Sequence, residues 1–281
     1  MIPSVSTRYI ALLGQPLGFS KASAMQNAAL RAYDMDALYF PLECSTDDLP
    51  VLLPALRRMP FLGLAVTKPL KMRIVPYLDE IDPAAARIGS CNTVRFQDGR
   101  LIGFNTDGLG FADMLRAHYG SFQNKNLLVC GAGGTARALC FACAAEGIGR
   151  IRVANRSFDH AQELTSALSK TGVQAEALTL ANVPDALADT DILVNATGLG
   201  MQPHEGESPI PAGVLSSHLF VCDLAYNPPR PRLLEDAAQA GCRILNGFDM
   251  SVYQGARQFH LLTGKIPPLD VMFDVMRQQL P

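Results

Sequence analysis

The stretch from Leu127 to Cys140, LLVCGAGGTARALC, joins a short apolar run to a second apolar segment through a glycine cluster. The run is typical of a buried strand, and the later segment predicts a helix. Gly131, Gly133 and Gly134 allow a tight turn and let a pyrophosphate approach the backbone. The free N–H groups at the start of the helix favour the same phosphate. The stretch therefore predicts a Rossmann-type dinucleotide site, although a glycine turn of purely structural origin is an alternative.

The next strand indicates which dinucleotide the site prefers. Ala136 occupies the third glycine position of the fingerprint, where alanine is tolerated. An NAD site places an acidic residue at the end of the following strand, roughly 20 residues on. Here that strand ends in VANRS, so Asn155 and Arg156 stand in place of the acid. Because Arg156 can pair with a 2′-phosphate and stack on adenine, the sequence favours NADP; the alternative is a solvated arginine at a strand end.

Composition restricts the classes of protein that the chain can belong to. Its 281 residues include 24 Lys and Arg against 26 Asp and Glu, without a basic block, which argues against nucleic-acid binding. No apolar run approaches the roughly 18 residues of a membrane helix, and the start, MIPSVSTRYIALLG, lacks signal-peptide features. Seven scattered cysteines predict reduced thiols and a cytoplasmic location. The pair Cys140 and Cys143 lies in an apolar helix pattern, and no histidine has metal-site spacing, so no metal is expected.

The order of apolar runs predicts two α/β domains with a ligand cleft between them. Strands are expected over 8–17, 37–44 and 62–68, helices over 21–34 and 79–89, and a hairpin over 92–105 around Asp98-Gly99. Ser45 is expected to cap a helix over 46–59. After a helix over 108–120, strands are expected over 126–131, 150–156, 192–198, 219–226 and 242–247. This pattern predicts a mainly parallel substrate-binding domain over 1–107, completed by helices in 250–281, and a Rossmann-type NAD(P)-binding domain over 108–249.

Small polar clusters follow the expected strands of the first domain. They are Thr67 with Lys71, then Asn92-Thr93, then Asn105-Thr106-Asp107. Side chains at strand ends converge on one site, where Lys71 beside a carboxylate could move a proton to or from an alcohol oxygen. On spacing alone, Lys71 as a surface residue and Asp107 as a helix cap remain alternatives.

Several motifs, in one order over nearly the whole chain, resemble those of a single enzyme family. AVTKPLK looks like NVTxPxK, SCNTV like AxNT, NTDGLG like NTDGxG, DLAYNP like DxxYxP, and NGFDMSVYQGARQF like GxxMLxxQxxxxF. GAGGTARA and NRS look like the nucleotide loop and the NADP-selecting stretch of that family. The chain thus resembles the shikimate and quinate dehydrogenases, as a divergent member.

The resemblance implies NADP-dependent oxidation of a ring hydroxyl on a cyclic hydroxy acid, in aromatic amino acid biosynthesis. It makes Lys71 and Asp107 the acid/base pair. It places Ser20 and Tyr226 near the substrate carboxylate, and Thr67, Asn92, Asp107 and Gln254 around the ring hydroxyls. The resemblance also places further residues at the cofactor, in addition to the three glycines, Asn155 and Arg156. These are Ala132, Thr135, Ser157, Thr197, Gly247 and Met250.

The substrate loop departs from the family pattern. Where the family reads HSxSPxxHN, residues 19–27 read FSKASAMQN, so Ala22 replaces a serine and Gln26 a histidine. Ala65 replaces an asparagine in AVTKPLK. A hydrogen bond to a charged group contributes roughly 1.5–3 kcal/mol, so these losses predict weaker carboxylate binding unless Ser23 compensates. His160, where the NADP enzymes of the family often carry a basic residue, leaves NAD use open.

These departures leave several functions open. The substrate could be shikimate, quinate, an aminoshikimate or a related polyol, with NADP or NAD as the cofactor. A non-catalytic dinucleotide-binding sensor is a second class, and a structural or partner-binding role has no supporting motif. Monomer and homodimer both remain open.

Overall fold

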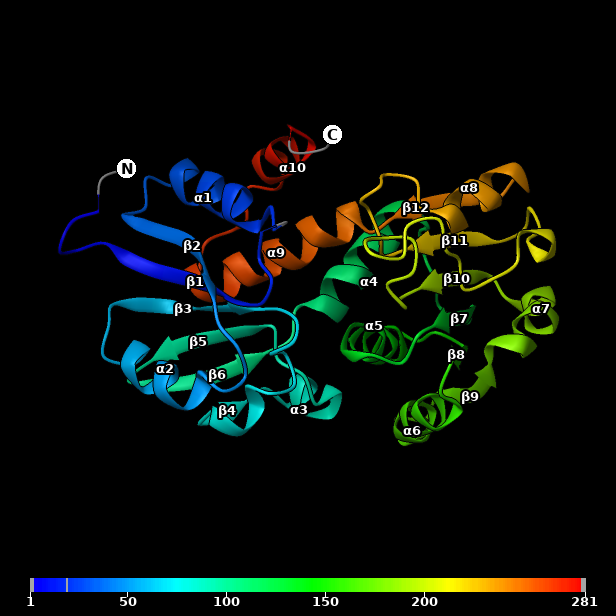
Figure 1. Cartoon of the computed structure of the whole chain (residues 1–281), viewed down its shortest axis with the longest axis horizontal. Coiled ribbons are helices and arrows are strands. Elements are labelled where there is room, and N and C mark those ends of the chain that lie inside the picture. The colour runs from blue at the N-terminus through cyan, green and yellow to red at the C-terminus, as the bar shows by residue number, and fades with distance from the viewer. Residues whose placement is uncertain (1–2, 19, 279–281) are drawn as a thin grey trace. The chain divides into compact units, whose positions relative to one another are not determined.

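A computed structural model describes residues 3–18 and 20–278 of the chain (Figure 1). The chain divides into two compact units. The first unit comprises Met1–Gly110 together with Val252–Pro281, and the second comprises Phe111–Ser251. The C-terminal segment therefore returns to the unit that contains the N-terminal strands.

The first unit is built on a six-stranded mixed sheet in the order β2-β1-β3-β5-β6-β4. Its strands are β1 (Arg8–Gly14), β2 (Ala37–Glu43), β3 (Phe61–Val66), β4 (Glu80–Ile81), β5 (Thr93–Gln97) and β6 (Arg100–Phe104). β1 runs parallel to β2 and β3, whereas β5 pairs antiparallel with β3 and β6. The mainly parallel sheet with an antiparallel addition that the sequence predicts is thus confirmed.

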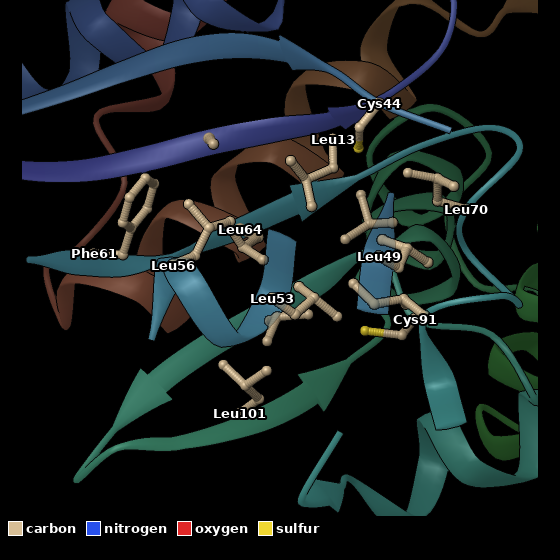
Figure 2. Packing of buried hydrophobic residues seen from close by; sticks show 14 residues of the cluster. Leu13, Cys44, Leu49, Leu53, Leu56, Phe61, Leu64, Leu70, Cys91 and Leu101 are labelled. Carbon is tan, nitrogen blue, oxygen red and sulfur yellow. The ribbon is translucent and has the colours of Figure 1, made fainter. Parts of the chain in front are cut away.

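Helices cover both faces of this sheet. They are α1 (Ala22–Ala32), α2 (Leu49–Leu56), α3 (Pro83–Ile88), the first turn of α4 (Asp107–His118), most of α9 (Phe248–Thr263) and α10 (Leu269–Gln278). Figure 2 shows side chains of α2, among them Leu49 and Leu53, in one cluster with Leu13 and Leu64 of the sheet. A Cβ on Gly63, the neighbour of Leu64, would meet Leu262 of α9 at 2.5 Å. Because successive strand residues point to opposite faces, α9 packs on the face opposite α2.

The hairpin forms where the sequence predicts it. Asp98 and Gly99 join β5 to β6, and both have positive φ, 51° and 74°. A two-residue hairpin turn with two positive φ angles matches the twist of the flanking strands, which explains the preference for Asp-Gly at this site.

Two local predictions are wrong. The helix expected over 46–59 is α2, which begins only at Leu49 and has Asp48, not Ser45, at its N-cap position. The carboxylate of Asp48 accepts hydrogen bonds from the backbone N–H and the hydroxyl of Ser45, so Ser45 is bound within the preceding turn. The helix expected over 79–89 is α3, preceded by the short strand β4, because Asp82 is its N-cap and accepts from the backbone N–H groups of Ala84 and Ala85.

The second unit is a six-stranded parallel sheet in the order β12-β11-β10-β7-β8-β9. Its strands are β7 (Asn126–Cys130), β8 (Arg150–Asn155), β9 (Gln174–Thr179), β10 (Ile192–Asn195), β11 (Phe220–Asp223) and β12 (Arg243–Asn246). This order is that of a doubly wound dinucleotide-binding fold, with a switch point between β7 and β10. The expected Rossmann-type fold is thus confirmed, and ligands of such sheets bind outside the carboxyl ends of the strands at the switch point.

Helices α5 (Gly134–Ala145), α6 (Phe158–Ser169), α7 (Val183–Ala186) and α8 (Arg232–Gln239) complete this unit. The strand β9 and the helices α6, α7 and α8 were not among the expected elements. The seven cysteines are buried and unpaired, including Cys140 and Cys143 in α5. Within residues 3–18 and 20–278, no helix combines the length and apolarity needed to cross a membrane.

Candidate active site

A lysine and an aspartate meet in the first unit. Lys71 lies in the loop after β3, and Asp107 is the first residue of α4. The Nζ atom of Lys71 donates to Oδ2 of Asp107 at 2.5 Å. Only 19% of the Lys71 side chain and 5% of the Asp107 side chain are exposed. A pair held this far from water keeps its mutual attraction but leaves the lysine side open to a ligand.

Asn92 holds the other oxygen of this carboxylate. Its Nδ2 atom donates to Oδ1 of Asp107 at 2.8 Å and to the Thr106 hydroxyl at 2.9 Å. Its Oδ1 atom accepts from the backbone N–H of Thr106 at 2.8 Å. The side chain of Asn105 starts α4 by accepting from the N–H of Asp107, so the three predicted polar clusters form one network.

The loop that carries Lys71 is fixed by backbone hydrogen bonds. The N–H of Thr67 donates to Leu13 O, and the N–H of Cys91 donates to Lys71 O, both at 2.8 Å. The Thr67 hydroxyl has no hydrogen-bond partner among the described residues, so it is available to a ligand. Gln254 of α9 joins the network through long contacts of 3.5 Å from Asn92 Nδ2 and the Thr106 hydroxyl to its Oε1 atom.

The backbone of α9 lies close to α4 at this point. A Cβ on Gly110 would meet the backbone N of Gln254 at 2.5 Å, so a side chain at this position would push the two helices apart. The glycine of NTDGLG that follows Asp107 by three residues therefore has a packing role. It brings Gln254 next to the residues that hold the carboxylate.

Ser20 and the altered loop positions lie around the start of α1. Ser20 is exposed, and its hydroxyl accepts from the N–H of Ala22 at 3.4 Å. Gln26 is 2% exposed and donates to Gly255 O of α9 at 2.9 Å, so it joins two helices. Ala65 is buried within β3, opposite Thr93. Phe19 lies outside the described residues.

The glycines of the turn between β7 and α5 differ in whether the fold itself requires them. Gly131 has φ +114°, and a Cβ there would meet Ala196 O at 2.8 Å, so the fold itself needs this glycine. Gly133 has an ordinary extended backbone (φ −74°, ψ 179°), and a Cβ there would meet no atom within 4 Å. The fold gives no reason for glycine at position 133, which is what close approach of a ligand would require. Gly134, with Thr135, begins α5, Ala132 lies within the turn, and Ala136 is fully buried.

The residues present fit a dinucleotide with a 2′-phosphate. No side chain caps the N-terminus of α5, which leaves its first N–H groups to an anion. At the end of β8, Asn155 Nδ2 donates to Ser157 O at 3.0 Å, which shapes the turn. Arg156 is exposed and forms no hydrogen bond or ion pair with another described residue. His160 lies in the first turn of α6 and is exposed.

The remaining predicted residues follow β10, β11 and β12. Thr197 donates to Asn195 Oδ1 at 2.7 Å and accepts from the N–H of Leu199. A Cβ on Gly247 would meet Leu224 O at 2.1 Å, so this glycine brings the loops after β11 and β12 together. Tyr226 is half-buried in the loop after β11, and Met250 is buried in the first turn of α9.

Comparison with known proteins identifies the chain. Family models match in three parts: the shikimate dehydrogenase substrate binding domain at residues 12–94, shikimate / quinate 5-dehydrogenase at 113–230, and the shikimate 5′-dehydrogenase C-terminal domain at 247–280. A shikimate dehydrogenase (NADP⁺) of Moorella thermoacetica is 40% identical over 98% of this chain and 94% of its own length. The chain belongs to the shikimate dehydrogenase family. It is accordingly an NAD(P)-dependent dehydrogenase.

Solved members of the shikimate dehydrogenase family share the whole fold. The shikimate 5-dehydrogenase of Listeria monocytogenes, in complex with shikimate and NAD, has a TM-score of 0.92 and 34% identity, covering 98% of each chain. The quinate dehydrogenase of Corynebacterium glutamicum, in complex with NAD, has a TM-score of 0.90 and 29% identity, covering 97% of this chain and 99% of its own. The same fold thus serves different acids within the family.

Sequence reasoning assigned no role to two buried residues that hold the loops after β10 and β11, although one of them, Asp223, is the first residue of the motif DLAYNP. Asn195 ends β10 and Asp223 ends β11, and both are 1% exposed. Asn195 Nδ2 donates to Asp223 Oδ2 at 3.0 Å and to Leu199 O at 3.1 Å, while Asp223 Oδ1 accepts from the N–H of Ala225 at 2.9 Å. The two side chains therefore fix the starts of both loops. Each residue ends an apolar run, and Asp223 also begins the motif DLAYNP; these were the available signals.

Burial raises the pKa of Asp223 from 3.8 to about 6, against the opposing effect of its two hydrogen bonds. A raised folded-state pKa favours the protonated form, so the stability that protonation contributes is present below pH 4 and is lost as the pH rises through 6. We expect Asp223→Asn, which does not titrate, to gain about 2 kcal/mol of unfolding free energy relative to the parent chain between pH 4 and pH 7. Urea unfolding of both chains at the two pH values measures this gain; a difference that is the same at both would contradict it.

Proposed function

We propose that this dehydrogenase oxidises a ring hydroxyl of a shikimate-like cyclic hydroxy acid with NADP, using Lys71 and Asp107 as the acid/base pair. The observation that carries the proposal is the buried contact of 2.5 Å between Lys71 Nζ and Asp107 Oδ2. Lys71 follows Thr67 by four residues in the unit whose residues 12–94 match the substrate binding domain of the family, and the Thr67 hydroxyl has no hydrogen-bond partner among the described residues. The name of the Moorella thermoacetica relative supports shikimate and NADP.

The chemistry then divides between the cofactor and the side chains. When NADP is bound, it supplies the hydride acceptor, and the chain supplies orientation and proton transfer. In the oxidation direction, Lys71 in its amine form takes the proton from the substrate hydroxyl as the C–O bond becomes a carbonyl. Asp107 stabilises the ammonium that forms, and Asn92 keeps that carboxylate oriented. In the reduction direction, the same ammonium returns the proton.

Several assignments in this proposal rest on family resemblance alone. Ser20 and Tyr226 as carboxylate ligands, and Thr67 and Gln254 as hydroxyl ligands, stay predictions. So do the domain roles, with residues 1–107 and 250–281 for substrate and 108–249 for the cofactor, and the cytoplasmic location.

The direct test is reduction of NADP by purified protein in the presence of shikimate, followed by the absorbance of the reduced nicotinamide. We expect turnover with shikimate. Turnover with no cyclic hydroxy acid, combined with undiminished NADP binding, would instead indicate a dinucleotide-binding sensor.

A second candidate is a quinate or aminoshikimate dehydrogenase that uses NAD. The observations that favour it are Ala22 and Ala65 in place of hydrogen-bonding residues, and the likeness to a quinate dehydrogenase solved with NAD. The same assay with quinate or an aminoshikimate and with NAD distinguishes it from the first candidate. A preference for those substrates that Ala22→Ser with Ala65→Asn shifts back toward shikimate would support it.

Arg156→Ala is expected to raise KM for NADP about ten- to hundredfold and to leave KM for NAD within about twofold. The free guanidinium at the end of β8 would pair with the 2′-phosphate, and a hydrogen bond to a charged group contributes roughly 1.5–3 kcal/mol. Steady-state kinetics with both cofactors measure the two constants, and NAD serves as the internal control. Equal changes in both constants would mean that Arg156 does not read the 2′-phosphate.

A further inference from the structure

Gln258 lies one helical turn after Gln254 on α9 and is 5% exposed. Its Nε2 atom donates to the backbone oxygen of Asn92 at 3.2 Å and to the Thr93 hydroxyl at 3.0 Å. Thr93 is the first residue of β5 and Asn92 directly precedes it, at the point where Asn92 approaches the Asp107 carboxylate. Residues i and i+4 of a helix share a face, so Gln254 and Gln258 both face this strand end.

The hydrogen bond from Gln258 to the Thr93 hydroxyl determines where that hydroxyl donates its own proton. A hydroxyl has one proton, and the Thr93 oxygen accepts from Gln258, so its proton is directed to Asn92 Oδ1 at 2.9 Å. The backbone N–H of Thr106 donates to the same Oδ1 atom. Two donors at one amide atom identify that atom as the oxygen. The Nδ2 group of Asn92 must then face Asp107 Oδ1, at 2.8 Å.

We infer that Gln258 is a positioning residue for proton transfer, which acts on Asp107 through Thr93 and Asn92. It does not touch the Lys71–Asp107 pair itself. This inference rests on the proposed function, because it assigns Gln258 a part in that reaction. Burying an amide without hydrogen bonds costs free energy, so a glutamine is a poor choice for filling space. The amide of Gln258 instead donates to Asn92 and Thr93, and Asn92 orients the Asp107 carboxylate.

The test is Gln258→Met, which keeps the length and approximate volume of the side chain and removes both donors. With shikimate and NADP, kcat is expected to fall about tenfold, and both KM values to stay within about threefold. The solvent deuterium isotope effect on kcat is expected to rise, because proton transfer becomes slower relative to the other steps. A loss of folded protein would lower the apparent kcat without changing that isotope effect.

Two further variants complete the experiment. Thr93→Val keeps the shape of the side chain and interrupts the same relay, so it is expected to reproduce the fall in kcat and the rise in isotope effect even if Gln258→Met folds poorly. Thr263→Val is the control on the same helix: it removes the hydrogen bond from the Thr263 hydroxyl to Phe259 O without touching Asn92. It is expected to change stability but to leave kcat within about twofold.

The outcomes distinguish a failure of the role of Gln258 from a failure of the proposed function. If Lys71→Ala abolishes turnover while Gln258→Met and Thr93→Val keep the kcat and isotope effect of the parent chain, the role of Gln258 is overturned and the proposed function stands. If Lys71→Ala retains full turnover, the acid/base assignment itself fails. A fall in kcat with a raised isotope effect in both relay variants supports the inference.

Discussion

Lys71→Ala is expected to lower kcat with shikimate and NADP by about 10²–10⁴, the usual contribution of general acid/base catalysis. In the proposed mechanism, the substitution removes the group that exchanges a proton with the substrate hydroxyl, whereas the residues that we propose for the cofactor site lie in the second unit. KM for NADP is therefore expected to change little. Steady-state kinetics over a range of shikimate and NADP concentrations measure both constants.

Lys68→Ala is the matched control for this result. Lys68 lies three residues earlier in the same loop, is exposed, and has no ion-pair partner among the described residues. Its replacement should leave kcat within about twofold. Because Lys71→Ala leaves the Asp107 carboxylate with Asn92 as its remaining partner, thermal unfolding of the variant must be compared with that of the parent chain. Equal kcat values for the two lysine variants would rule out Lys71 as the acid/base group.

Gly133→Val is expected to weaken NADP binding about a hundredfold while the protein stays folded. The backbone of Gly133 suits any residue, and a new Cβ meets no atom within 4 Å, so valine fits the unliganded turn. Its methyl groups would occupy the space in front of the uncapped N-terminus of α5, where we expect the pyrophosphate. Loss of one or two hydrogen bonds to a charged group, each roughly 1.5–3 kcal/mol, gives the expected change in Kd.

Calorimetric titration with NADP measures this change, and Gly213→Val provides the control. Gly213 lies in the short 3₁₀ helix Ala212–Val214 of the same unit, and a Cβ there also meets no atom within 4 Å. The control should bind NADP as the parent chain does. An unchanged Kd in Gly133→Val would mean that the pyrophosphate does not approach this turn.

The elements that the sequence predicts well are those fixed by local chemistry. The run before Gly131 becomes β7 and the segment after it becomes α5, because apolar composition and glycine position determine both. The turn at Asp98-Gly99 forms because these residues tolerate the positive φ angles that a two-residue hairpin needs.

The local predictions that failed depend on competition between neighbouring residues. Ser45 and Asp48 both suit a helix start, and only the three-dimensional structure shows that Asp48 binds Ser45 within the turn and α2 begins later. The strand β9 was missed because its residues, QAEALT, include no aromatic side chain and only one β-branched side chain, Thr179, so the pattern does not mark a strand. It forms at the edge of the sheet through pairing with β8.

In the candidate site, too, the residues marked by local sequence could be predicted, and the residue that depends on distant contacts could not. Lys71, Asn92 and Asp107 could be singled out from polar clusters after apolar runs, and in the structure they form one network. Gln258 could not be singled out from the sequence, because its hydrogen-bond partners Asn92 and Thr93 are more than 160 residues away along the chain. Because Gln258 follows Gln254 by four residues, the sequence indicates that both lie on the same face of a helix. It does not indicate which residues the two side chains contact.

The measurement that tests the central claim most directly is a crystal structure of the protein with shikimate and NADP bound. We predict that Lys71 Nζ and a carboxylate oxygen of Asp107 both lie about 3 Å from the same ring hydroxyl, as hydrogen bonds to the group that is oxidised. A substrate bound with no hydroxyl within hydrogen-bond distance of Lys71 or Asp107, in crystals that turn over, would contradict the assignment of this pair.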